Sequence, residues 1–107
     1  MKTTILLLAI FLRGCELCPA AQPDFNAYAD AIRKSEAVWT YGIKGVRVRN
    51  EAEARRVCIN TVKHAYRDWD GSGAFVDALA SRYCPASADP VGNRNWRRNV
   101  QWFLKHP

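Results

Sequence analysis

The fold class is decided by the stretch Asn50-Glu51-Ala52-Glu53-Ala54-Arg55-Arg56-Val57-Cys58, which begins the clearest helix that the sequence predicts. Asn50 is a good N-cap, and Glu53 follows three residues later, as in a capping box. Apolar side chains then recur at helical spacing as far as Trp69. The residues expected on the inner face are Ala54, Val57, Cys58, Thr61, Ala65 and Trp69. The glycine-rich run 70–73 ends this helix.

Three further helices are predicted on either side of it. The first covers about residues 24–37, with Asp24 as its cap. The third covers about 74–83, and the fourth covers about 94–105 after a loop rich in Pro, Ser and Asp. Their expected inward-facing residues are Phe25, Tyr28, Ala29, Ile32, Glu36, Phe75, Val76, Leu79, Tyr83, Trp96, Val100, Phe103 and Leu104. The chain is therefore expected to be one all-α domain.

The segment between the first two helices shows a different pattern. A glycine-punctuated turn over residues 40–45 is followed by Val46 and Val48, which alternate with Arg47 and Arg49. This alternation predicts a short extended edge. The fold is therefore all-α, with at most a two-stranded hairpin over residues 41–49.

The first 20 residues predict a signal peptide. Met1-Lys2 is a basic start, and an apolar run of about ten residues follows, the length of a signal h-region rather than of a membrane anchor. Cleavage after Ala20 leaves a domain of residues 21–107 that is exported to the periplasm or the extracellular space. Two alternatives remain at this point, lipoprotein processing at Cys15 and a buried N-terminal helix. No stretch after residue 20 is long and apolar enough to predict a transmembrane helix.

Cysteine usage adds a prediction about stability. Removal of residues 1–20 leaves only Cys58 and Cys84, and an even number in an exported chain predicts a disulfide. Closing a loop of that length would contribute about 3 kcal/mol. The histidines, His64 and His106, do not sit at ligand spacing from another candidate, so neither a metal nor a cofactor is expected.

The domain is basic. From residue 21 onward it has 14 Lys and Arg against 9 Asp and Glu. This excess predicts a polyanionic partner such as a wall polymer or an anionic membrane surface, or simply a solvated basic surface. Nucleic acid is not expected, because the chain has no recognised binding motif and is predicted to be exported.

Glu36 is the strongest candidate for chemistry. It extends the apolar stripe of the first helix at the C-terminal end, where partial desolvation and the helix dipole would both raise its pKa. A carboxylic acid that is protonated near neutral pH is what glycoside cleavage requires. The alternative is a frayed helix end with Glu36 in water.

The run Ala31-Ile32-Arg33-Lys34-Ser35-Glu36, followed by Tyr41-Gly42-Ile43-Lys44-Gly45, resembles the lysozyme-like superfamily. Lytic transglycosylases of that superfamily have a helix that ends in a catalytic Glu, followed by a glycine-rich turn facing the sugar groove. The turn is also similar to the FGIKG turn of bacterial glucosaminidases. The resemblance covers about residues 28–48 and implies a miniature lysozyme-like domain. It further implies that one Glu acts as acid and then as base.

The function predicted from this resemblance is peptidoglycan glycan-strand cleavage by Glu36, of lytic-transglycosylase or glucosaminidase type. Trp39, Tyr41 and Asn99 are the candidate contacts to the sugar, although the aromatic residues could equally belong to the core. The rival prediction is a non-catalytic exported module that binds cell-wall glycan or a protein partner through the same groove. In either case we expect a monomer.

Overall fold

The computed structural model describes residues 22–107, and this part of the chain forms four helices and no strand. The helices are α1 (Phe25–Glu36), α2 (Glu51–Asp68), α3 (Phe75–Tyr83) and α4 (Pro90–Lys105). The prediction of an all-α fold is confirmed. The predicted signal peptide and Cys15 lie outside the described residues.

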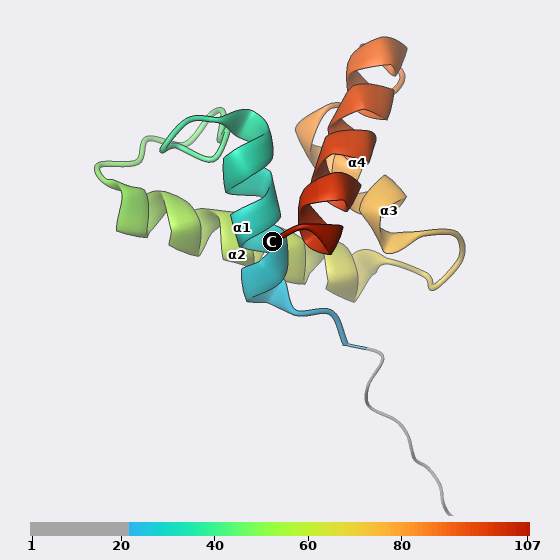
Figure 1. The fold of residues 1–107 in the computed structure, drawn as a ribbon, viewed down its shortest axis with the longest axis horizontal. Helices are drawn as coiled ribbons and strands as arrows, with labels where there is room; N and C mark the ends of the chain where they lie inside the picture. Colours follow the sequence, from blue (N-terminus) through green and yellow to red (C-terminus); the bar gives the residue numbers. More distant parts are fainter. Residues whose placement is uncertain (1–21) are drawn as a thin grey trace, which may run out of the picture.

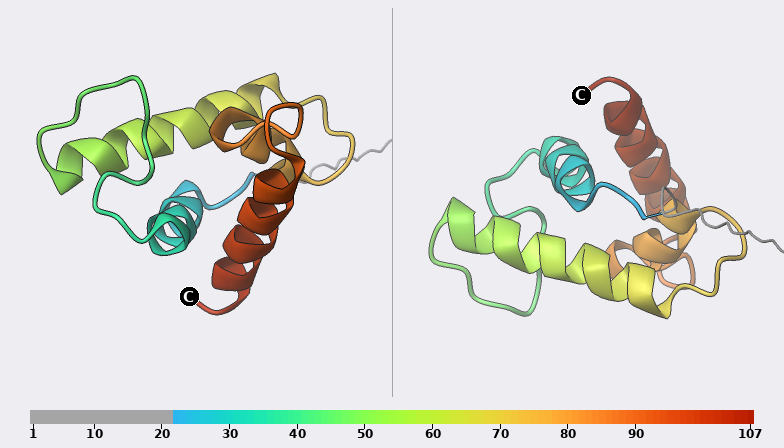
Figure 2. Two further views of the ribbon diagram at one scale, coloured as in Figure 1. Left: turned by 90° about the horizontal axis from the view of Figure 1, so that it is seen from above. Right: turned by 90° about the horizontal axis from the view of Figure 1, so that it is seen from below.

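The helices pack in a ring rather than in a layer. The helix α1 packs against α2 and α4, and α3 packs against the same two helices. In Figure 1, α2 runs across the view and α1 crosses it, while α4 stands beside α1. Figure 2 shows α1 nearly end-on between α2 and α4. Every helix therefore buries one face toward a shared centre.

All four helices contribute side chains to the core. The buried apolar residues are Ala29, Ala31, Ile32, Tyr41, Ala54, Cys58, Val62, Ala65, Phe75, Val76, Leu79, Ala80, Trp96 and Val100. Only Tyr41 lies outside a helix. An aromatic cluster extends the core at one end, where the ring of Phe75 contacts the rings of Tyr28, Tyr66 and Trp69.

Side-chain caps set the start of three helices. Asp24 accepts hydrogen bonds from the backbone N–H groups of residues 26 and 27, and Asn50 accepts one from Glu53. The fourth helix begins at Pro90, four residues earlier than the sequence pattern predicted. The reason is local: Asp89 caps the backbone N–H of Gly92, and Pro90 has the backbone angle that the first helical turn requires.

The predicted extended edge is not formed within residues 22–107. The backbone has positive φ angles at Tyr41, Gly42 and Gly45, and these angles interrupt an extended strand. Val46 is 54% exposed. Segment 37–50 is therefore a loop that folds back over α2. In the described part of the chain, no helix is long and apolar enough to cross a membrane.

Candidate functional site

Glu36 is the last residue of α1, and the turn that follows places its carboxylate. Ala37 adopts the left-handed conformation and returns its N–H to the carbonyl of Arg33, which ends the helix. Two further turns, from Tyr41 to Val38 and from Ile43 to Thr40, bring Gly42 back against the carboxylate. A methyl group at Gly42 would lie only 2.6 Å from Oε1 of Glu36. The glycine of the turn thus provides room for the acid.

The carboxylate is held from the other side by α4. The indole Nε1–H of Trp96 donates a hydrogen bond to Oε2 of Glu36 at 2.9 Å. Trp96 is buried and stacks on Tyr83, with the ring centroids 5.0 Å apart. The Tyr83 hydroxyl in turn lies 3.4 Å from Sγ of Cys58. A polar chain, Glu36–Trp96–Tyr83–Cys58, therefore takes one residue from each of the four helices.

Burial changes the acidity of Tyr83 and Cys58, the two residues at the inner end of this polar chain. It raises the pKa of the Tyr83 hydroxyl and the pKa of the Cys58 thiol, because the ionised forms would be poorly solvated. Both groups are therefore neutral near pH 7. The carboxylate of Glu36 is the one acidic group in the polar chain that lies near the surface.

Glu36 differs from the other carboxylates within residues 22–107 in its partner. Each of the other eight accepts a hydrogen bond from an arginine side chain or from a backbone N–H group. These residues are Asp24, Asp30, Glu51, Glu53, Asp68, Asp70, Asp77 and Asp89. Glu36 accepts instead from a neutral indole. Its carboxylate is therefore neither an ion-pair partner nor a helix cap in the described structure.

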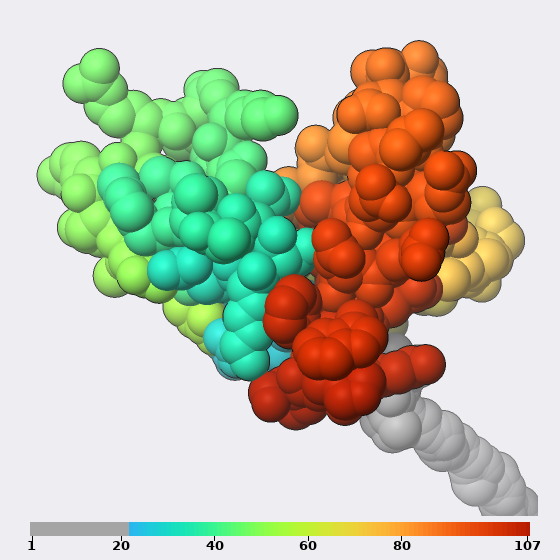
Figure 3. Space-filling model, turned by 45° about the horizontal axis from the view of Figure 1, so that its top comes forward, coloured from blue at the N-terminus to red at the C-terminus, as the bar shows by residue number. Residues whose placement is uncertain are grey.

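A pocket of about 140 Å³ opens beside this acid. Its lining residues are Gly42, Ile43, Lys44, Val46, Val57, Thr61, Arg82 and Tyr83. Gly42 and Tyr83 connect the pocket to Glu36, since one packs against the carboxylate and the other stacks on Trp96. The lining residues come from the loop 37–50, from α2 and from α3. Figure 3 shows the surface hollowed beside the green loop, on the side that faces the orange start of α4. Of the two cations in the lining, Arg82 is paired with Asp68 at 2.8 Å, so Lys44 supplies the positive charge of the pocket.

The three residues that were predicted to contact the sugar do not gather around Glu36. Tyr41 is 2% exposed, and Nη1 of Arg55 lies 3.3 Å from its hydroxyl, so it belongs to the core. Trp39 is 43% exposed, and Asn99 lies exposed on α4; neither lines the pocket. The structure therefore brings Gly42, Trp96 and Tyr83, rather than these three, to the acid.

Arg55 is half-buried, and its guanidinium links α2 to α1 and to the loop that follows α1. Its Nη1 donates to Asp30 at 2.7 Å, and its hydrogen bonds to Tyr41 and Asp30 raise its pKa above the ordinary value. Arg55 therefore fastens the loop residue Tyr41 to the helices. Neither the capping residue Asn50 nor the helical spacing predicts this role, because the contacts of Arg55 depend on how α1 crosses α2.

The predicted disulfide is not formed, and both Cys58 and Cys84 are free thiols in the structure. Their side chains have different neighbours. Cys58 is buried on α2 against the Tyr83 hydroxyl, whereas Cys84 lies close to α4, where a methyl group at Gly92 would come within 3.0 Å of its sulfur. Asn93 fixes this corner, because its side-chain amide donates to the Cys84 carbonyl at 2.7 Å.

Within residues 22–107, no group of three or more His, Cys, Asp or Glu is arranged to hold a metal ion. No family model, curated protein or solved structure matches the chain.

Proposed function

We propose that this domain cleaves peptidoglycan glycan strands, with Glu36 as the single acid and base of a lytic-transglycosylase-type reaction in a lysozyme-like domain. The observation that carries the proposal is the environment of Glu36. It is the one carboxylate in the described chain whose hydrogen bond comes from an indole and from neither an arginine nor a backbone N–H group, and it packs against Gly42, a lining residue of the pocket. The other carboxylates of the described chain accept instead from an arginine or from a backbone N–H group, as ion-pair partners or caps do.

The hydrogen bond from Trp96 gives the two oxygens of Glu36 different tasks. Because Oε2 accepts the indole proton, a neutral Glu36 carries its own proton on Oε1, the oxygen that lies over Gly42. Oε1 is then the donor to the glycosidic oxygen as the bond from that oxygen to C1 breaks. The 6-hydroxyl of the same muramyl unit attacks C1, and its proton returns to Oε1. The ring closes to an anhydro sugar without water.

This reaction needs one carboxylate, whereas the usual glycosidase mechanisms need a pair. The lining of the pocket contains no Asp or Glu, and the other carboxylates of residues 22–107 are occupied as caps or ion pairs. Lys44 would face the acidic groups of a peptide-bearing glycan. These features favour the single-acid route over hydrolysis by two carboxylates.

The size of the pocket supports a second candidate. A volume of about 140 Å³ accommodates a small group rather than several sugar rings. An exported module that binds cell-wall glycan or a protein partner without turnover would need no more than this. In that case Glu36 and Trp96 would simply join α1 to α4.

The test is to incubate the purified full chain with peptidoglycan sacculi and to identify released muropeptides by mass spectrometry. Anhydro-muropeptides are expected from the wild type, and reducing ends would indicate glucosaminidase-type hydrolysis instead. Glu36→Gln should lower the rate about 10²–10⁴-fold, the usual contribution of acid–base catalysis. Glu51→Gln is the matched control, because Glu51 is exposed and paired with Arg33. Activity retained in Glu36→Gln would refute the catalytic role, and binding without products would favour the binding module.

A further inference from the structure

The outer face of α4 is the most basic helical surface in the described chain. The 16 residues of α4 include Arg94, Arg97, Arg98 and Lys105 and contain no Asp or Glu. Arg97 is paired with Asp77. The other three cations are exposed and have no carboxylate partner within residues 22–107. This helix therefore presents positive charge that the rest of the described fold does not neutralise.

Apolar side chains lie on the same face. Val91, Arg94, Arg98, Trp102 and Lys105 follow one another at intervals of three or four residues, so they form a single row along the helix. At 1.5 Å per residue the row is about 21 Å long. Val91 is 54% exposed and Trp102 is 55% exposed. The row thus combines three cations with the two most exposed large apolar side chains of α4.

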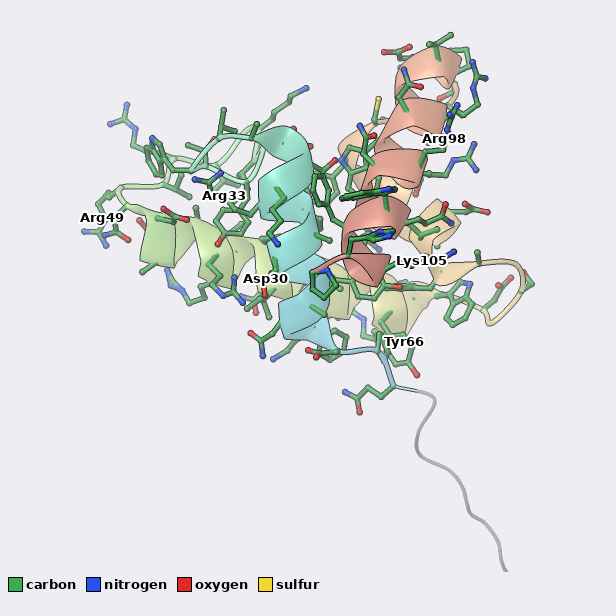
Figure 4. All side chains as sticks on the ribbon, viewed as in Figure 1. Asp30, Arg33, Arg49, Tyr66, Arg98 and Lys105 are labelled. Atoms are coloured by element: carbon green, nitrogen blue, oxygen red, sulfur yellow. The ribbon has the colours of Figure 1, made fainter. Side chains whose placement is uncertain are left out.

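This row faces away from the other helices. The buried residues of α4 are Asn93, Trp96 and Val100, on the opposite side of the helix. Figure 2 shows one long side of α4 free of the remaining helices. Figure 4 shows Arg98 and Lys105 on α4, with Arg98 extending outward. The row is therefore open to a partner along its whole length.

We propose that this row binds the surface of an anionic phospholipid bilayer. Arginine and lysine side chains near such a surface are attracted to the lipid headgroups, and tryptophan is favoured at the boundary between headgroups and acyl chains. A helix with basic and apolar side chains on one side can lie in the plane of the interface. Trp102 would enter the headgroup layer beside Arg98 and Lys105.

The exposed apolar residues favour a bilayer over a soluble polyanion. Val91 offers neither a hydrogen bond nor a stacking surface to a sugar or a nucleotide. One face of the Trp102 ring is already covered by His106, whose ring centroid lies 4.1 Å away at an interplanar angle of 22°. A polyanion would use the cations alone, whereas a bilayer would also remove Val91 and Trp102 from water. A domain bound in this way would turn the hollow beside Glu36 away from the bilayer, because Trp96 lies on the other side of α4.

The experiment measures co-sedimentation of the full chain with phosphatidylcholine vesicles, with and without phosphatidylglycerol. The ratio of the binding to the two vesicle types separates the contribution of charge from any apolar anchoring by other parts of the chain. The double variant Arg94→Gln/Arg98→Gln should lower this ratio roughly 25-fold, since each cation near an anionic surface contributes a factor of about five. The control Arg47→Gln/Lys63→Gln removes two exposed cations elsewhere and should change the ratio little.

A second measurement identifies the side chain that enters the bilayer. Lipids brominated on the acyl chain should quench tryptophan fluorescence in the wild type, and Trp102→Phe should remove most of that quenching. Two results would overturn the proposal. One is an equal loss of binding in the control pair, which would show that net charge alone is responsible. The other is inorganic polyphosphate binding as tight as vesicle binding, with quenching that does not depend on Trp102.

Discussion

The indole of Trp96 donates a hydrogen bond to Glu36 across 60 positions of sequence, and this bond joins the end of α1 to the middle of α4. The bond restricts the carboxylate to one orientation, with Oε2 toward the core and Oε1 over Gly42. Trp96 is itself fixed by its stacking on Tyr83. The position of the candidate acid therefore depends on α3 and α4 as much as on its own helix.

Replacing Trp96 by Phe removes the N–H donor and retains an aromatic ring against Tyr83. We expect the free energy of unfolding to fall by about 1–3 kcal/mol, because a hydrogen bond to a carboxylate is lost. Release of muropeptides should also fall, because Glu36 is no longer oriented. Chemical denaturation and the sacculus assay measure the two effects. The control is Trp102→Phe at an exposed position of the same helix, and an equal effect in both variants would contradict the assignment.

Replacing Gly42 by Ala tests the packing of the turn against Glu36. Gly42 and Gly45 both have positive φ angles, at 69° and 78°, so alanine should cost about 1 kcal/mol at either position. At Gly42 the new methyl group would meet the carboxylate of Glu36. A methyl group at Gly45 would have no atom within 4 Å. Gly42→Ala should therefore cost about 1–2 kcal/mol more than Gly45→Ala, because Glu36 must leave Trp96.

The double variant Gly42→Ala/Trp96→Phe provides an internal check on this prediction. If both changes act through the same hydrogen bond, the combined loss of stability is smaller than the sum of the single losses. Strictly additive losses would show that Gly42 acts through its backbone conformation alone.

The partly buried Tyr83 and the buried Cys58 predict a loss of stability at alkaline pH. Burial raises the pKa of both groups in the folded state, so the unfolded chain releases these protons first as the pH rises. Their stabilising contribution is present in full below the ordinary pKa values of 9.0 and 10.0 and is lost as the pH rises above them. The free energy of unfolding should therefore decline from about pH 9 upward.

Denaturant titrations at several alkaline pH values measure this decline. Tyr83→Phe retains the ring on Trp96 and removes the phenol, so its stability should decline less steeply than that of the wild type. Parallel curves for the two proteins would show that another group is responsible. Tyr28 is the first alternative, because burial also raises its pKa, and Tyr28→Phe is the comparison.

Local sequence signals determined the helices. Asp24 and Asn50 are capping residues whose side chains accept hydrogen bonds from backbone groups a few positions away, so their effect does not depend on the rest of the fold. Asp89 and Pro90 act in the same local way at the start of α4. The apolar pattern alone nevertheless predicted a start at about residue 94. The apolar spacing likewise placed Ile32, Leu79 and Val100 in the core, because a helix with one apolar face buries that face wherever it packs.

Tertiary structure alone decided the contacts between helices. The sequence indicated that Glu36 and Trp96 both face inward, but the hydrogen bond between them depends on the angle at which α1 meets α4. Cys58 and Cys84 were expected to pair because both were available, yet one side chain lies against Tyr83 and the other against Gly92. Tyr41 was expected in a groove and is buried beside Arg55. Each of these outcomes joins residues far apart in the chain, and a distance across the core is fixed by the packing of whole helices rather than by local sequence.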